Sequence, residues 1–271
     1  MRSMQRSLPW KARVRWPQPG EPGGGSRRRL KLPRARKLLL SCLAIVLAAV
    51  LGLAVLLLVT PSVGNAPQLA RAFDQAHRAA YPGLAVPVRF ATSLEATEDH
   101  RFAAEPGVDP VAVGRVALGA LTGKADQGGA TLYQQLAKML YTPGLSSLAA
   151  KAEQVALAVK LKYSYTGAEI LRLYADVAYF GHGFYGLQSA TCGYFGVGPA
   201  RLSWPQAALL AGLVQAPSSD DPIANPAAGR AREQHVIGRL VAVGAITQAS
   251  ADAYLKVPLA DLLAHAGACQ G

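Results

Sequence analysis

Cysteine is rare in this chain, with three residues among 271. Cys42 lies in an apolar run, where a thiol packs like a small hydrophobic side chain. Cys192 and Cys269 could pair in an oxidising compartment or remain two unpaired thiols. Two cysteines make no disulfide framework in either case, so a domain of this length must rest on a packed core.

Acidic residues are also few. There are 16 Asp and Glu against 28 Lys and Arg, and the formal net charge is +12. Residues 1–37 contain twelve of the basic residues and one acid, Glu21, so this segment carries +11 and the other 234 residues carry +1. The segment is rich in proline and glycine, which is typical of a disordered tail. Membrane topology explains its charge more simply than nucleic acid does, and no nucleic-acid partner is expected.

Charged residues are absent from residues 38–59, a run of 22 residues in which only Ser41 and Cys42 are mildly polar. A helix of roughly 20 apolar residues spans a bilayer, whereas the apolar core of a cleaved signal peptide has about 7–15 residues. The run is therefore interpreted as an uncleaved transmembrane helix. Basic residues precede it, so the positive-inside rule places the N-terminus in the cytoplasm and the rest of the chain outside it.

Strand alternation and internal repeats are missing from the rest of the chain, apart from one candidate strand at residues 86–90. Residues 67–265 are rich in Ala and Leu at helical spacing, which predicts one mainly α, irregular domain after a linker at 60–66. Helices are expected at residues 66–80, 91–99, 109–122, 131–141, 146–163, 167–178, 205–214, 226–243 and 247–254.

The helix expected at 91–99 carries Glu98 near its end, followed by Asp99 and Phe102. Such a carboxylate can be an ordinary solvated helix end, since most acids are exposed. Alternatively, it can act as a general base whose neighbours tune its pKa. The residues alone leave both interpretations open.

The segment 128–130 leads through Thr131 into Gln134, Gln135 and Lys138. Thr131 is a good N-cap for the helix that follows, and Gln134 and Lys138 share a face because they are four residues apart. The plain interpretation is a capped helix with a polar face. The functional interpretation is a set of amides and an ammonium group that hold a phosphate near a helix N-terminus.

Two later segments, 151–158 and 170–186, are predicted to be an amphipathic helix and a packing region rich in glycine and aromatic residues. His182 lies in the second segment. No metal role is expected for this histidine, because the usual partner ligands are missing around it.

Taken in order and spacing, these segments resemble the glycosyltransferase family 51 domain of peptidoglycan polymerases. Residues 98–102 look like the motif E-D-x-x-F, and residues 128–138 resemble G-G-S-T-I-x-Q-Q-L-x-K. Residues 150–158 resemble R-K-x-x-E-x-x-x-A, and residues 170–186 are similar to I-L-E-x-Y-L-N followed by Y-F-G-x-G-x-Y-G. Residues 207–217 look like A-A-L-L-A-G-L…Q-A-P, and residues 225–226 match N-P. The resemblance covers about residues 67–258.

The resemblance implies a lysozyme-like domain that polymerises lipid II into β-1,4 glycan strands and releases undecaprenyl pyrophosphate. Glu98 would take the proton from the acceptor's 4-hydroxyl, and Gln154 stands where the family has its second catalytic Glu. The substrate-binding residues that it carries over are Asp99, Phe102, Thr131, Gln134, Gln135, Lys138 and Lys151. It implies no firm cofactor, with a divalent cation, Mg²⁺ or Mn²⁺, as the candidate.

The implied partners are lipid II, the nascent glycan strand, the membrane and other proteins of cell-wall synthesis. The implied location is the bacterial inner membrane, with a single span and the C-terminal domain in the periplasm. The sequence contains no S-x-x-K or K-T-G motif, so a transpeptidase domain is not expected.

Several positions depart from the family pattern. Gln154 carries no charge, Ala150 stands in place of an Arg, and Ala130, Met139 and Glu105 replace a Ser, an Asn and a His. A second interpretation is therefore a catalytically impaired relative that binds lipid II or glycan, or that acts as a scaffold. A third, a lysozyme-like hydrolase with its glutamate as general acid, is disfavoured by the membrane anchor and the Gln-Gln-Leu-Ala-Lys segment.

Overall fold

The computed structural model describes residues 32–80, 83–109 and 130–263. The chain divides into two compact units, residues 1–50 and 51–271.

Three expectations fall outside the described residues. They are the structure of the tail up to residue 31, nearly all of the helix expected at 109–122, and the pairing of Cys192 with Cys269. Cys42 lies within the described part of the chain and is a free cysteine.

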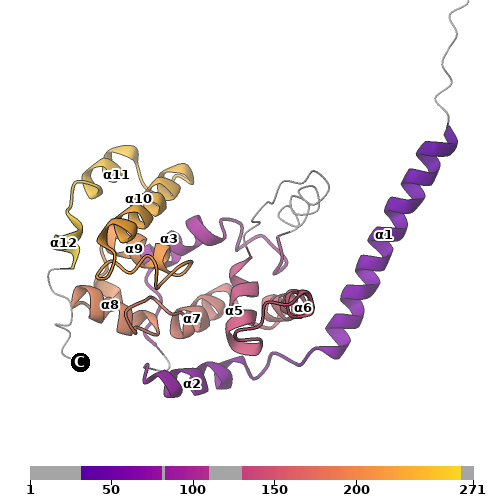
Figure 1. The fold of residues 1–271 in the computed structure, drawn as a ribbon, viewed down its shortest axis with the longest axis horizontal. Coiled ribbons are helices and arrows are strands. Elements are labelled where there is room, and N and C mark those ends of the chain that lie inside the picture. Colours follow the sequence, from indigo (N-terminus) through magenta and orange to yellow (C-terminus); the bar gives the residue numbers. More distant parts are fainter. Residues whose placement is uncertain (1–31, 81–82, 110–129, 264–271) are drawn as a thin grey trace, which may run out of the picture. The chain divides into compact units, whose positions relative to one another are not determined.

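The long N-terminal helix α1 (Leu32–Val59) contains the whole predicted span (Figure 1). Its segment Arg36–Val59 has 24 residues and is long and apolar enough to cross a membrane. At 1.5 Å per residue that segment is about 36 Å long, and a hydrocarbon core is about 30 Å thick. Most of its described leucines are exposed, for example Leu38 by 68% and Leu58 by 85%. An exposed apolar surface of this extent is typical of a helix that lies in a membrane.

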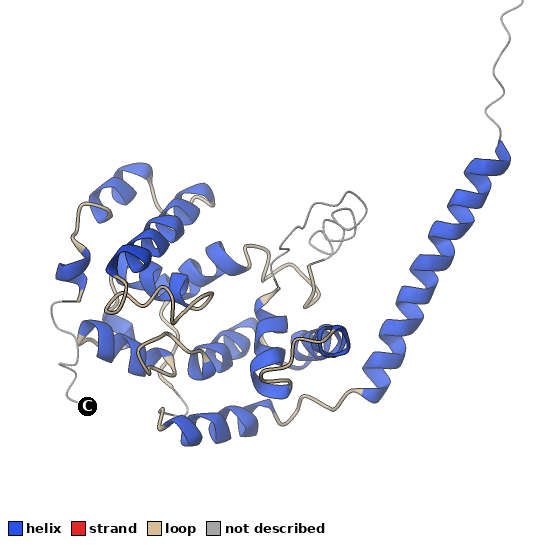
Figure 2. Cartoon of the chain, viewed as in Figure 1, coloured by secondary structure: helices blue, strands red, loops and turns tan. Residues whose placement is uncertain are grey.

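The described residues outside α1 form helices joined by loops, and Figure 2 shows no strand among them. The helices are α2 (Ala66–His77), α3 (Val88–Glu98), α5 (Leu132–Tyr141), α6 (Leu148–Ser164), α7 (Gly167–Val177), α8 (Leu187–Phe195), α9 (Trp204–Leu213), α10 (Pro226–Ala242), α11 (Gln248–Tyr254) and α12 (Leu259–Leu262), with a short 3₁₀ helix at Pro199–Arg201. One isolated β-bridge joins Tyr179 and Tyr185. The expectation of a mainly α fold is confirmed.

The candidate strand at residues 86–90 was wrong, because helix α3 begins at Val88. Pro87 is its N-cap residue, with φ −66° and ψ 143°. Phe90 and Leu94 are four residues apart and both buried, so the apolar residues follow a helical period rather than an alternating one.

Helix α8 was not expected from the sequence. It starts after Gly186, which has φ 80° and no side chain to cap the helix. The usual start signal is therefore absent, and a glycine is needed there because this conformation is unfavourable for other residues.

Side-chain caps explain why most of the predicted helices begin where they do. A serine, threonine or asparagine oxygen accepts a backbone N–H from the first turn in each case, which typically stabilises a helix by about 0.5–2 kcal/mol. These caps are Thr131, Ser147, Thr166, Ser203, Asn225 and Thr247.

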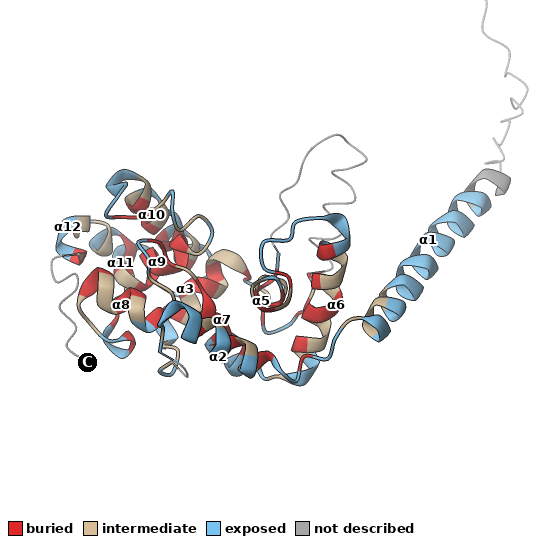
Figure 3. Ribbon diagram, turned by 60° about the horizontal axis from the view of Figure 1, so that its bottom comes forward, coloured by how far each residue is buried: buried red, intermediate tan, exposed pale blue. Residues whose placement is uncertain are grey.

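Helix α9 forms the centre of the domain, packed against α3 and α10. It is apolar on every side and buried through most of its length, as expected for a core helix. Figure 3 shows the buried residues gathered around these helices. Arg239 of α10 donates a hydrogen bond to the carbonyl of Ala96 on α3, at 3.1 Å. The last turn of α3, which carries Glu98, is thereby fixed against the core.

Candidate active site

Glu98 is the last residue of α3, and its carboxylate faces helix α5. Its Oε2 accepts a hydrogen bond from Nε2 of Gln135, at 3.0 Å. Burial raises the pKa of Glu98, while this hydrogen bond and the charge of Arg232 partly offset the effect. The carboxylate is therefore a stronger base than an exposed glutamate.

Gln135 is held by three hydrogen bonds. Its Nε2 also donates to the carbonyl oxygen of Ala130, at 3.2 Å. Its Oε1 accepts from the hydroxyl of Tyr174, at 2.8 Å. Both ends of the amide are thus occupied, and its orientation toward Glu98 is set.

Asp99 connects the end of α3 to the start of α5. Its side chain is buried, and Oδ2 accepts a hydrogen bond from the backbone N–H of Leu132, at 3.0 Å. That N–H belongs to the first turn of α5 and has no partner within the helix. The structure therefore gives Asp99 a positioning role, because it brings α5 to Glu98.

Glu105, which stands in place of the family histidine, is buried behind Asp99. Burial and the nearby charge of Asp99 raise the pKa of Glu105 to about 8. Glu105 therefore keeps its proton to a higher pH than an exposed glutamate does, which limits the negative charge beside Asp99.

Thr131 and Gln134 form a capping box at the start of α5. The Thr131 hydroxyl accepts from the N–H of Gln134 at 3.1 Å, and Oε1 of Gln134 accepts from the N–H of Thr131 at 3.0 Å. The same hydroxyl donates to the carbonyl of Gly107, at 2.7 Å. These bonds commit the Thr131 hydroxyl to the fold.

Phe102 is buried and stacks on Tyr133, with ring centroids 4.8 Å apart. Its ring also lies against Gly167. The side chain is thus part of the packing that supports the loop after Glu98.

Lys138 is exposed on α5, three residues beyond Gln135 and so on the same face of the helix. Lys151 is exposed near the start of α6. Neither ammonium group is hydrogen-bonded to another residue in the described ranges, so both can meet an anionic ligand.

Gln154 lies on α6 and is buried. Its Nε2 donates to the hydroxyl of Thr142, at 2.8 Å, and Thr142 is the C-cap residue that follows α5. Glu98 therefore meets α5 at Gln135, and Gln154 meets it seven residues further on, about 10 Å along the helix axis. Glu98 and Gln154 thus contact opposite ends of one face of α5, and Lys138 lies between the two contacts on that face.

A pocket of about 180 Å³ lies beside Glu98. An ion pair between Arg101 and Asp109 forms part of its wall. Its described lining residues are Thr97, Glu98, Asp99, His100, Arg101, Asp109 and Thr131.

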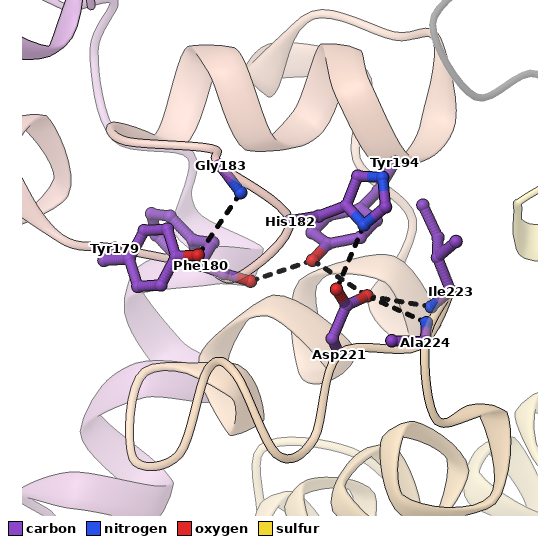
Figure 4. Close-up of polar contacts among 8 residues, drawn as sticks. All are labelled: Tyr179, Phe180, His182, Gly183, Tyr194, Asp221, Ile223 and Ala224. Carbon is purple, nitrogen blue, oxygen red and sulfur yellow. Dashed lines mark hydrogen bonds and ion pairs between the residues drawn. The ribbon is translucent and has the colours of Figure 1, made fainter.

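No group of three or more His, Cys, Asp or Glu residues in the described part of the chain could hold a metal ion. His182 instead lies 3.0 Å, at Nδ1, from Oδ2 of Asp221 (Figure 4). Oδ1 of Asp221 accepts from the N–H of Ile223, at 2.9 Å. The imidazole therefore ties the loop after α7 to the loop before α10.

Sequence reasoning did not single out two residues of this site. Tyr174 appeared only as part of a packing segment, because a tyrosine inside an apolar helix is usually core. Arg232 is one of several arginines on α10, and nothing in the sequence distinguishes it. Its guanidinium binds the carbonyl of Gly212, with Nε at 3.1 Å, and its charge lowers the pKa of Glu98.

Comparison with known proteins gives the same family as the motifs. The family model described as Transglycosylase matches residues 66–241. A protein of Cupriavidus necator named as a candidate transglycosylase is 33% identical over 174 residues, which are 64% of this chain and 75% of that protein.

Two longer relatives are named penicillin-binding protein 1A. The one from Aquifex aeolicus is 33% identical over 247 residues, 83% of this chain and 34% of that protein. The one from Escherichia coli is 37% identical over 168 residues, 62% of this chain and 20% of that protein. The chain thus spans about a third or less of these two relatives.

Among solved structures, penicillin-binding protein 1A from Haemophilus influenzae matches 47% of this chain and 16% of that chain, at 26% identity and a TM-score of 0.33. A score this low carries no argument about the fold. The family match spans most of the helical domain and contains all the motif segments, including those with Glu98, Gln135 and Gln154. The chain therefore belongs to the transglycosylase family, the glycosyltransferase family 51 that its motifs resemble.

Proposed function

We propose that this protein is a membrane-anchored peptidoglycan glycosyltransferase that polymerises lipid II into β-1,4 glycan strands. The observation that carries the proposal is the pairing of Glu98 with Gln135, one helical turn from the exposed Lys138. This reaction needs a base at the acceptor and a positive charge at the leaving group. Glu98 has a raised pKa, and the nearby Lys138 ammonium group has no hydrogen-bond partner among the described residues. Family membership supports the same activity.

In the proposed reaction, Glu98 takes the proton of the acceptor's 4-hydroxyl. The freed oxygen attacks the anomeric carbon of the donor, and the bond from that carbon to pyrophosphate breaks with inversion. The electron pair of the broken bond leaves with undecaprenyl pyrophosphate. The charge of Lys138 stabilises the negative charge on that leaving group.

We propose that the region around Gln154 contributes less to catalysis than the region around Glu98 does. Its amide bonds Thr142 but carries no charge. No step is assigned to a divalent cation, since the residues that the structure describes form no ligand set for one.

The test is polymerisation of labelled lipid II by the full-length protein in detergent. Glu98→Gln keeps the size of the side chain and should abolish glycan strands. Asp252→Asn changes an exposed carboxylate on α11 and should leave the rate unchanged. Lys138→Met should lower activity strongly, while Lys256→Met, at another exposed lysine, should not. Equal activity of Glu98→Gln and wild type would refute the assigned base.

A second candidate is a non-catalytic relative that binds lipid II or glycan. The uncharged Gln154 and Ala150 favour it, because both stand where the family carries a charge. Measurable lipid II binding by wild type without any polymer would establish this alternative. Association with the membrane, with the nascent glycan and with other cell-wall synthesis proteins is proposed under either function.

A further inference from the structure

Three side chains from three helices form a hydrogen-bonded line that ends at Glu98. Tyr174 of α7 donates to Oε1 of Gln135 on α5, at 2.8 Å, and Nε2 of Gln135 donates to Glu98 at the end of α3, at 3.0 Å. Tyr174 is almost fully buried, with 2% of its surface exposed. Its hydroxyl therefore lies behind Gln135, away from any substrate.

The Tyr174 hydroxyl, together with Glu98 and the Ala130 carbonyl, fixes which end of the Gln135 amide faces the carboxylate. A glutamine amide has one oxygen acceptor and one nitrogen with two N–H donors. Both donors are used here, one toward Glu98 and one toward the carbonyl of Ala130. Turning the amide over would set its oxygen against two other acceptors, and the tyrosine hydroxyl would lose the oxygen to which it donates.

The tyrosine stays a donor throughout the working pH range. Burial raises the pKa of Tyr174 above its ordinary value, and the negative charge of Glu98 raises it further. A neutral phenol thus holds the amide, and the amide holds one carboxylate oxygen. Oε1 of Glu98 accepts no hydrogen bond from the described residues, so it is the oxygen left for an acceptor hydroxyl.

We propose that Tyr174 is a positioning residue for Glu98 that acts through Gln135. The proposal rests on the proposed function, because it assigns Tyr174 to the geometry of the same base. It differs from a packing role in one respect: removing only the hydroxyl should change how Glu98 ionises, and not only how stable the protein is.

The chain offers a matched control for this test. Tyr194 on α8 is also fully buried, and its hydroxyl donates to the carbonyl of Phe180, at 3.0 Å (Figure 4). Tyr174→Phe and Tyr194→Phe each remove one buried hydroxyl; among the described residues that of Tyr174 bonds Gln135 alone, whereas that of Tyr194 also lies 3.5 Å from Oδ1 of Asp221. Only the first hydroxyl is linked to the proposed base.

The experiment compares the pH dependence of lipid II polymerisation by wild type, Tyr174→Phe and Tyr194→Phe, after thermal melts show that each variant is folded. Losing a bond that supports the ionised carboxylate should move the acid limb of kcat to higher pH by about one unit. The rate on that limb falls about tenfold, with KM little changed. Tyr194→Phe should keep the wild-type limb. An unmoved limb in Tyr174→Phe, or an equal shift in both variants, overturns the proposal.

Gln135→Leu tests the second hydrogen bond of the line, the one from Gln135 to Glu98. It also replaces Tyr174→Phe in the experiment if that variant does not fold. It should shift the limb at least as far, and adding Tyr174→Phe to it should cause no further shift. A full additional shift would show that the tyrosine acts by another route.

Failure of the proposed function gives a different result. If wild type makes no polymer, the pKa of Glu98 is followed by ¹³C carboxyl NMR in wild type and both Phe variants, with Glu98→Gln to assign the signal. A higher pKa in Tyr174→Phe alone supports the positioning role in an inactive protein. The same pKa in all three overturns it.

Discussion

Glu98 and Asp99 are neighbours in sequence with different surroundings. Glu98 accepts one hydrogen bond from a side chain and lies at a pocket, whereas Asp99 is buried and accepts a backbone N–H from α5. Thr131 is likewise committed to a helix cap. Residues expected together as substrate contacts therefore have different hydrogen-bonding roles, although Glu98, Asp99 and Thr131 all line the same pocket.

At the same scale, the neutral Gln154 gives a prediction about rate. Gln154→Glu places a carboxylate beside the Thr142 hydroxyl, which can turn to donate to it. Single electrostatic contacts in active sites contribute about 10²–10³ in rate, so turnover of lipid II should rise. Gln154→Met has a similar size without charge and should not raise it. A rate that is unchanged or lower in Gln154→Glu would show that this position does not limit the chemistry.

At the scale of elements, helix α5 organises the site. Asp99 holds its first turn, a capping box sets its start, and Gln154 contacts its C-cap residue. Helices α2 and α7 also pack together, and each brings a buried carboxyl, Asp74 and Asp176. Both Asp74 oxygens lack a hydrogen-bond partner among the described residues.

This carboxyl pair predicts a pH-dependent stability. Burial, and then the charge of Asp176, raise the pKa of Asp74 from 3.8 to about 7. The folded protein keeps this proton to a higher pH than the unfolded chain does, so stability is lost as pH rises from about 4 through about 7. Asp74→Asn should therefore melt several degrees above wild type at pH 8 and close to it at pH 4.

Thermal melts at both pH values test this expectation, with Asp252→Asn at an exposed site as the control. One kcal/mol corresponds to roughly 2–4 °C in a domain of this size. A constant difference between Asp74→Asn and wild type across pH would rule out titration of Asp74 as the cause.

At the scale of the whole molecule, an apolar helix with an exposed surface is joined in sequence to a helical domain of the transglycosylase family. A membrane-anchored protein accounts for both parts, because lipid is the solvent in which such a helix is stable. Its orientation is proposed from the basic residues that precede it.

A fusion experiment tests that orientation. A fluorescent protein that folds only in the cytoplasm should be bright at the N-terminus, and a β-lactamase fused after the helical domain should protect the cells. Replacing Arg34, Arg36 and Lys37 with Gln should weaken the preference, because it removes the basic residues nearest the span. A dark N-terminal fusion in a stably expressed protein would reverse the proposed topology.

Most of the helices could be predicted, because their signals are local. Apolar spacing and a capping residue such as Thr131 or Ser203 lie within a few positions of each other. Helix α8 lacked such a signal, since Gly186 offers no capping side chain. The candidate strand at residues 86–90 is too short to distinguish an alternating pattern from a helical one. Helix α3 contains residues 88–90 of it.

The sequence by itself determined the apolar span, the helical class, and the order of motifs that identifies the family, because each depends on residues close together in the chain. Tertiary structure alone decided which side chains meet. Glu98 and Gln135 are 37 positions apart, and Gln135 and Tyr174 are 39 apart. Contacts over such separations depend on how α3, α5 and α7 pack, and no local pattern encodes that packing.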